Sequence, residues 1–145
     1  MFNKNDPQIS KEHKEFLEKC IAVVEKHLND EVFNVQILQK EMGMSHSTLY
    51  RRIKSVSGLS INAFVRLIRL QKAAEILINT NCNATEASLM AGFNGAKYFR
   101  QQFQKVFGML PSEYIKKYRT TFDSPHAIKK EAAESGGPTN DASIL

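Results

Sequence analysis

The chain has 145 residues, of which 42% are apolar, and a net charge of +5, which suits one modest soluble domain or two very small ones. No apolar run approaches the ~18 residues of a membrane-spanning helix, and the polar N-terminus holds no signal peptide. We therefore expect a cytoplasmic protein without membrane contact. Cys20 and Cys82 are isolated in the sequence, which favours reduced thiols over a disulfide or a metal site.

After a lead-in of residues 1–9, apolar residues recur at helical spacing as far as Gly58. Polar N-cap residues and helix-ending glycines divide this stretch. It predicts three helices, bounded by Ser10 and about Asn29, by Asn34 and Gly43, and by Ser45 and Gly58. The last two make a first helix-turn-helix, at about residues 34–58.

A longer helix follows from Ser60 to about Asn79. Its apolar residues are broad enough to pack against a cluster at each end. About 20 residues at ~1.5 Å each span ~30 Å, which is close to the ~34 Å between successive major grooves on one face of DNA. The helix is therefore a predicted linker with a length suited to two neighbouring grooves.

Another helix pair occupies about residues 83–108, and a last short helix follows it. Asn83 is the predicted N-cap of this pair, with Glu86 three residues on as a capping box. Pro111 suits the first residue of the last helix, which runs to about Arg119. Residues 120–145 are rich in Ser, Thr, Gly and Pro, so we expect a flexible tail beyond a domain of residues 10–119.

The two helix pairs are copies of one pattern. Before the turn the offset is 49, which pairs Gly43 with Gly92. After the turn the offset is 50, which pairs Gly58 with Gly108, so one residue is inserted in the second turn. A short helix, a tight turn and a second helix with a polar outer face fit a major groove.

Equivalent polar side chains share the outward face of the second helix in each copy. They are Ser47, Tyr50, Arg51 and Lys54 in the first copy, and Lys97, Arg100, Gln101 and Gln104 in the second. Arginine can bond guanine in a fork and glutamine can do so with adenine. One such face alone is more often simply solvated, but two equivalent faces favour DNA reading.

Other polar residues are candidates for the DNA backbone, which fixes register without reading sequence. They are Ser45, His46, Lys54, Arg66, Arg69, Gln104 and Lys105. Plain solvent exposure is the alternative for His46, Arg66 and Arg69. Residues 42–119 hold 12 Lys or Arg against 3 Asp or Glu, and positive charge of this density attracts a polyanion.

No pattern of catalytic or cofactor-binding residues competes with this interpretation. The four histidines lack metal-ligand spacing, and there is no P-loop, GxSxG or glycine-rich phosphate cradle. We expect neither an enzyme nor a bound cofactor. The rival functions are a helical adaptor that binds protein through its repeated hairpins and a nucleic-acid binder without sequence preference.

At about residues 16–119 the chain resembles the DNA-binding domain of AraC/XylS-type transcription regulators. The matching segments are LQKEMGMSHSTLYRRIKSVSG, SINAFVRLIRLQKAAEIL and ATEASLMAGFNGAKYFRQQFQKVFGMLPSEYIKKYR. The resemblance implies an all-α fold of seven helices, in which a long linker helix joins two helix-turn-helix subdomains. By position, it implies base reading by Ser47, Tyr50 and Arg51, and by Ala96, Lys97, Arg100 and Gln101.

Some positions depart from the family pattern. Ser47 and Ala96 are smaller or less polar than the usual readers, and Gly95 replaces a more usual polar residue. The segments FLEKCIAVVEKHL and LYRRIKSVSG are most similar to the output domain of hybrid two-component regulators. This likeness implies a monomeric module of a larger sensor and receiver polypeptide. Such a module would bind double-stranded DNA and activate transcription, with RNA polymerase as a candidate second partner.

Overall fold

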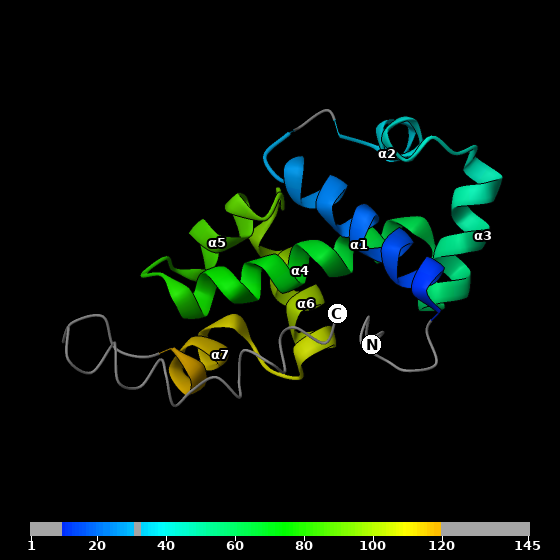
Figure 1. Cartoon of the computed structure of the whole chain (residues 1–145). Helices are drawn as coiled ribbons and strands as arrows, with labels where there is room; N and C mark the ends of the chain where they lie inside the picture. Colours follow the sequence, from blue (N-terminus) through cyan, green and yellow to red (C-terminus); the bar gives the residue numbers. More distant parts are fainter. Residues whose placement is uncertain (1–9, 31–32, 120–145) are drawn as a thin grey trace. The chain divides into compact units, whose positions relative to one another are not determined.

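The computed structural model describes residues 10–30 and 33–119, and its elements within them are seven α-helices and no strand (Figure 1). In chain order they are α1 (Lys11–Lys26), α2 (Val35–Met42), α3 (His46–Ser57), α4 (Ile61–Asn79), α5 (Ala84–Met90), α6 (Ala96–Phe107) and α7 (Pro111–Tyr118). The predicted all-α fold is confirmed. The lead-in of residues 1–9 and the expected tail of residues 120–145 lie outside the described part.

Polar side chains start most of these helices where the sequence predicts them. The Asn34 side chain accepts the Ile37 N–H at 3.0 Å, which satisfies one of the amides that a helix start leaves without a partner. Asn83 accepts the Glu86 N–H at 2.8 Å, while the Glu86 carboxylate accepts the Asn83 N–H at 2.9 Å. The predicted capping box is therefore present.

Helix α1 ends earlier than the sequence suggests. It was expected to reach about Asn29, but its last helical residue is Lys26. The His27 N–H donates to the Val24 carbonyl at 3.1 Å, and the Asp30 N–H donates to the His27 carbonyl at 3.1 Å. These bonds tighten the chain into turns, which ends the regular helix.

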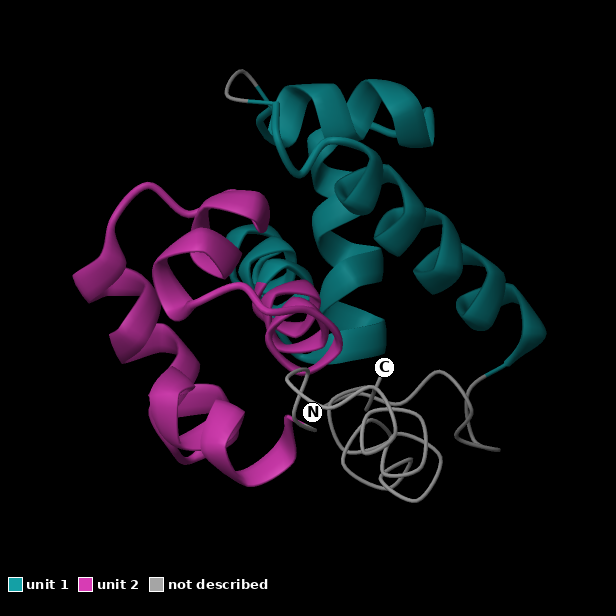
Figure 2. Cartoon of the chain, turned by 90° about the vertical axis from the view of Figure 1, so that its left-hand side faces the viewer, with its two compact units in different colours: residues 1–69, 144–145 teal, residues 70–143 magenta. Residues whose placement is uncertain are grey.

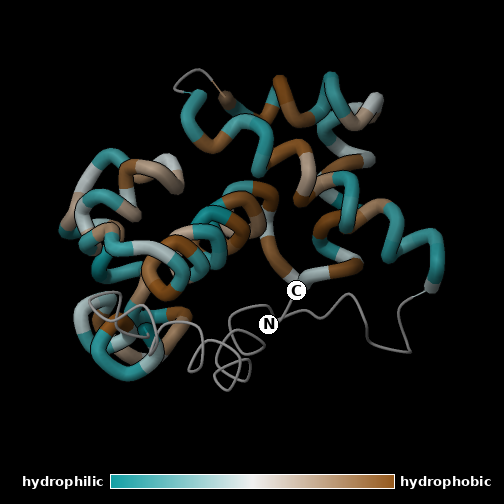
Figure 3. Tube along the Cα trace, turned by 60° about the vertical axis from the view of Figure 1, so that its left-hand side comes forward, coloured by the Kyte–Doolittle hydropathy of each residue, from teal (hydrophilic) through white to brown (hydrophobic). Residues whose placement is uncertain are grey.

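The chain divides between Arg69 and Leu70 into two compact units, coloured separately in Figure 2. Helix α4 continues across this boundary and gives buried residues to both units: Ile61, Phe64 and Ile68 to the first, and Leu70, Ala74 and Leu77 to the second. The broad apolar surface predicted for this helix is therefore used at both ends. Along the helices hydrophobic and hydrophilic residues alternate (Figure 3), as amphipathic helices require.

The first unit packs α1, α2 and α3 with the first half of α4. Its core holds fully buried aliphatic side chains from each of these helices, among them Leu17, Leu38, Leu49, Ile53 and Ile68. The second unit has an aromatic core. Phe103 is fully buried, and its ring centre lies 5.6 Å from that of Phe99 and 5.3 Å from that of Tyr114. Each unit thus has a core of its own, which fixes the position of α3 in the first unit and of α6 in the second.

The sequence repeat is reproduced in the backbone hydrogen bonds of the two turns. The Met44 N–H donates to the Gln39 carbonyl at 3.0 Å, and 49 residues later the Phe93 N–H donates to the Ser88 carbonyl at 2.8 Å. Each turn has a glycine just before its donor residue: Gly43 has a φ of 67° and Gly92 has a φ of 90°. This closing pattern needs a left-handed residue, which explains glycine in both turns.

Candidate nucleic-acid interface

Helix α3 separates an inward face from an outward one. Leu49 and Ile53 are fully buried in the core of the first unit. The predicted base readers Ser47, Tyr50 and Arg51 are exposed, and Tyr50 keeps 43% of its surface open to solvent. The residues next to the buried ones along α3 therefore present polar or charged side chains on the other side of the helix, where a DNA groove could meet them.

Helix α6 repeats this division in the second unit. Phe99 and Phe103 are buried, and all the predicted readers are exposed: Ala96, Lys97, Arg100 and Gln101. Tyr98, which was not among the predicted readers, is 46% exposed, and its ring centre lies 6.3 Å from that of Phe93. It lies 50 residues after Thr48, so the repeat alone gave no aromatic signal at this position.

The two reading helices start differently. The Ser45 hydroxyl accepts the Thr48 N–H at 3.3 Å and donates to the Thr48 hydroxyl at 3.0 Å. Helix α6 starts after Gly95, which provides no side-chain cap. Ser45, a predicted backbone contact, is thus already used to order the first turn of α3, whereas α6 lacks this restraint.

Among the predicted backbone contacts, the polar residues of α3 and α6 are exposed: His46, Lys54, Gln104 and Lys105. Arg66 and Arg69 on α4 are only half-exposed. The Arg69 guanidinium donates to the Leu28 carbonyl at 3.4 Å and lies 5.8 Å from the Phe33 ring centre. Burial lowers the pKa of Arg69. This arginine thus has contacts inside the first unit that its place in the sequence did not predict.

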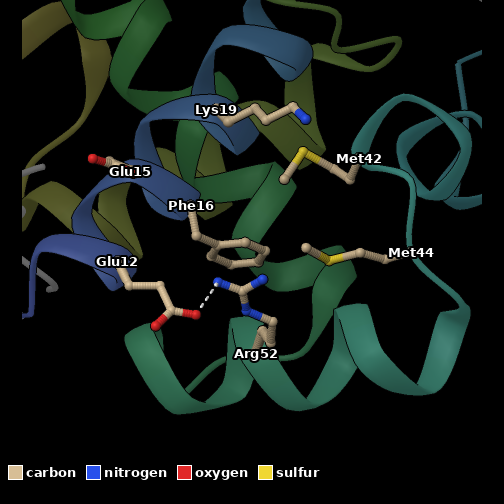
Figure 4. A pocket seen from close by; sticks show the side chains of 7 residues that line it. All are labelled: Glu12, Glu15, Phe16, Lys19, Met42, Met44 and Arg52. Atoms are coloured by element: carbon tan, nitrogen blue, oxygen red, sulfur yellow. Dashed lines mark ion pairs between the residues drawn. The ribbon is translucent and has the colours of Figure 1, made fainter.

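Arg52 is a basic residue of α3 whose charge turns inward. Figure 4 shows its guanidinium beside the Phe16 ring, in a hollow between α1 and α3 that Met42 and Met44 also line. The guanidinium carbon lies 4.2 Å from the ring centre, and the Arg52 Nη2 lies 3.8 Å from the Glu12 Oε1. Arg52 was not among the residues predicted for the site. Its spacing of three residues after Leu49 placed it beside the buried stripe, which is the signal that would have found it.

Arg119, which closes α7, is a second structural arginine that was not predicted. Its Nε donates to the Leu77 carbonyl at 2.5 Å, and its Nη2 donates to the Cys82 carbonyl. These bonds tie the end of α7 to the end of α4 and to the connection before α5. Residue charge alone therefore does not identify DNA contacts, because Arg52, Arg69 and Arg119 all have partners within their units.

Neither a metal site nor a membrane helix is present in the part of the chain that the structure describes. No three His, Cys, Asp or Glu side chains there are placed to share a metal ion. No helix within residues 10–30 and 33–119 combines the length and apolar character needed to cross a bilayer.

Comparison with known proteins shows where this architecture occurs. A family model described as a helix-turn-helix domain matches residues 38–117. Over 114 residues the chain is 35% identical to histidine kinase P4 of Formosa agariphila, which covers 79% of the chain and 8% of that protein. Over 73 residues it is 36% identical to the xylose operon regulatory protein of Escherichia coli K12, which covers 50% of the chain and 19% of that protein.

Solved structures share the fold. The C-terminal domain of AraT, a response regulator from Geobacillus stearothermophilus, matches with a TM-score of 0.65 at 24% identity, over 82% of this chain and 95% of that one. The DNA-binding domain of AdpA, solved in complex with a target DNA, matches with a TM-score of 0.61 at 26% identity, over 70% and 91%. The chain itself spans less than one fifth of the length of the curated relatives named above.

Proposed function

The chain belongs to the AraC-type family of helix-turn-helix DNA-binding domains, and we propose that its two units read one DNA site together. In this proposal α3 enters one major groove and α6 enters the next. The observation that carries it is the repetition of the turn, with the same backbone bonds at an offset of 49, before two exposed polar helix faces. The length of α4, 19 residues or ~28 Å, supports neighbouring grooves.

Base reading is assigned to the exposed arginines and amides of the two faces. Arg51 and Arg100 have the fork that bonds guanine O6 and N7, and Gln101 has the amide that bonds adenine. Tyr50 offers an apolar ring edge to a thymine methyl. Because the two faces carry different side chains, one monomer would bind a non-palindromic site.

Phosphate contacts are assigned to residues around these faces, which fix register rather than sequence. Those on the reading helices and their caps are Ser45, His46, Lys54, Gln104 and Lys105, and Arg66 on α4 is a further candidate. Arg69 was predicted for the same role, but its internal contacts make it the weakest of this set. About six to eight neutralised phosphates would give a log–log salt slope of about −5 to −7.

The setting of this domain is also a proposal. The similarity to a histidine kinase, of which the chain spans 8%, and to response-regulator C-terminal domains supports an output role in a larger signalling protein. There the domain would activate transcription from the cytoplasmic side, with RNA polymerase as a second partner. A regulator named as a transcriptional activator is 28% identical over 97 residues.

The decisive experiment selects bound duplexes from a random library and then compares variants on the selected site. Arg51→Ala should lose ~1–3 kcal/mol on that site and relax one base position, with a much smaller loss on unrelated DNA. Lys14→Ala, which removes an equal charge from the exposed surface of α1, is the matched control. If Arg51→Ala loses the same binding free energy on unrelated DNA, Arg51 contacts a phosphate and does not read a base.

Arg100→Ala extends this test to the geometry of the two units. If α3 and α6 occupy successive grooves, the base positions relaxed by the two variants should lie about 10 base pairs apart. Relaxed positions that coincide, or a footprint confined to one groove, would contradict paired reading. The adaptor alternative predicts little salt dependence, and the non-specific alternative predicts that unrelated duplex competes equally well.

A further inference from the structure

A cluster of charged side chains surrounds His27, which directly follows α1 and lies on neither of the predicted DNA-reading helices. Its Nδ1 lies 3.1 Å from a carboxylate oxygen of Asp30, and its Nε2 contacts a carboxylate oxygen of Glu41 on α2. Only 16% of the His27 side chain is exposed. The imidazole therefore bridges α1, the following turn and α2.

This geometry requires a charged ring. An ionised carboxylate only accepts hydrogen bonds, whereas a neutral imidazole has one N–H donor and one bare nitrogen. With a carboxylate on each ring nitrogen, both bonds form only when the imidazole carries two protons. Loss of one proton leaves a nitrogen lone pair facing Asp30 or Glu41, so one of the two bonds is lost.

Each element around His27 contributes a charged group. Lys26 of α1 has its Nζ 3.1 Å from the other oxygen of Glu41. The Phe33 ring stacks on the imidazole with a centroid distance of 5.0 Å, and the Arg69 guanidinium of α4 lies over that same phenyl ring. The facing charged groups are thus Lys26, Asp30, Glu41 and Arg69, while Glu31 lies outside the described residues.

We propose that the proton on His27 fastens α1 to α2 and thereby makes the first DNA-reading unit respond to pH. We call the contacts of His27 with Asp30 and Glu41 the clasp. Helix α2 is the first helix of the helix-turn-helix and packs against α3, so the clasp holds in place a helix that positions α3. Protonation would favour the ordered unit, and by linkage DNA would bind more tightly at mildly acidic than at mildly alkaline pH. The DNA part of this inference rests on the proposed function.

The expected pH range follows from the two partners. The hydrogen bond to Glu41 raises the pKa of His27 above its ordinary value, and the same bond lowers the pKa of Glu41. The stabilisation by His27 is full below the ordinary histidine pKa of about 6.5 and disappears as pH rises through the raised pKa. In acid it is lost again, as pH falls through the lowered pKa of Glu41.

The clasp is tested first without DNA, by following the His27 ring protons through a pH titration by NMR. Wild-type His27 should titrate above the ordinary histidine range. Glu41→Gln keeps the size of the side chain but removes the carboxylate charge, so it should move the His27 pKa down. A wild-type His27 pKa at or below the ordinary value, or one that Glu41→Gln leaves unchanged, overturns the proposal.

DNA affinity is then measured on the selected duplex at about pH 6 and about pH 8.5, on either side of the ordinary histidine pKa. Wild type should lose about two- to fivefold in affinity between them, the range given by ion pairs near a surface. His27→Gln should lose markedly less. His13→Gln, which changes the histidine within α1 and outside the cluster, is the matched control and should behave like wild type.

Equal pH dependence in wild type and His27→Gln would overturn the link to DNA binding. If no duplex is bound at either pH, the proposed function itself fails. The clasp can still be tested in that case by urea unfolding. The urea midpoint of wild type should fall between about pH 6 and about pH 8.5, whereas that of His27→Gln should not. A urea midpoint with the same pH dependence in both proteins would overturn the clasp.

Discussion

The guanidinium carbon of Arg52 lies 4.2 Å from the centre of the Phe16 ring. Arg52 directly follows Arg51 on α3, yet of the two only Arg51 is exposed. We expect Arg52→Ala to destabilise the first unit by about 0.5–2 kcal/mol, since it removes a cation–π contact that is partly shielded from water. Arg51→Ala should stay within about 0.5 kcal/mol of wild type. Urea unfolding of both variants measures the difference.

The same pair of arginines separates packing from recognition. Arg52→Ala should have the larger effect on stability, whereas Arg51→Ala should have the larger effect on DNA recognition. On the selected DNA site we expect Arg51→Ala to change base preference and Arg52→Ala to leave it unchanged. Arg52→Met keeps much of the apolar stem, so it should recover part of the stability lost in Arg52→Ala. If Arg52→Ala unfolds like wild type but alters base preference, the inward assignment of this side chain is wrong.

Gly95 is a position where a new side chain should stabilise the fold. Its φ of −129° and ψ of 126° suit any residue, and a Cβ there would meet its nearest neighbour, the Tyr98 Cβ, at 3.9 Å. Gly95→Ser can cap α6 as Ser45 caps α3, and it restricts the unfolded chain. We expect a gain of about 0.5–1 kcal/mol, measured as a higher melting temperature.

Gly43→Ala is the contrasting variant. Gly43 has a φ of 67° in the turn between α2 and α3, where an L side chain is strained even though no atom lies within 4 Å of the added Cβ. The expected loss is about 1–2 kcal/mol. Backbone geometry alone thus predicts opposite changes in stability for substitutions at Gly95 and Gly43. A loss in Gly95→Ser as large as that in Gly43→Ala would contradict this explanation.

Phe103→Ala should unfold the second unit, at a cost of about 3–5 kcal/mol. Phe103 is fully buried and its ring contacts those of Phe99, Phe107 and Tyr114. Amide hydrogen exchange should show loss of protection in α6 and α7, with less change in α1 and α2. Ile53→Ala is the counterpart in the first unit. If Phe103→Ala keeps wild-type protection throughout, the inward face of α6 is misassigned.

The features that the sequence predicted correctly are those set by residues three to five positions apart. Asn34, Ser45 and Asn83 start helices through bonds to residues three positions on, and an amphipathic pattern needs only the helical period. The internal repeat strengthened these predictions, because an error in one copy would conflict with the other. Local chemistry thus accounts for all seven helices, with the end of α1 misplaced by about three residues.

Contacts between distant residues explain what the sequence did not reveal. Arg52 meets Phe16 across 36 positions, and His27 meets Glu41 across 14. No local period specifies such pairs, so a basic residue on a helix cannot be assigned to DNA or to packing until its neighbours are known. This is why Arg69 was expected at a phosphate, although its guanidinium contacts Leu28.

The two cysteines should differ sharply towards thiol reagents. Burial raises the pKa of the Cys20 thiol to about 12, and its side chain is fully enclosed next to Met42. Cys82 is half-exposed, with its sulfur 3.7 Å from that of Met90. Since the thiolate is the reactive form, a disulfide reagent at neutral pH should label Cys82 quickly. Cys20 should react only as fast as the first unit opens.

Cysteine variants assign the two phases of this reaction. Cys82→Ser should abolish the fast phase and leave the slow one, while Cys20→Ala should do the reverse. Arg52→Ala should speed the slow phase, because it loosens the unit that encloses Cys20, whereas Arg51→Ala should leave it unchanged. Equal labelling rates at both cysteines in the folded protein would show that the core around α1 is open. The packing from which α3 gains its fixed position would then be absent.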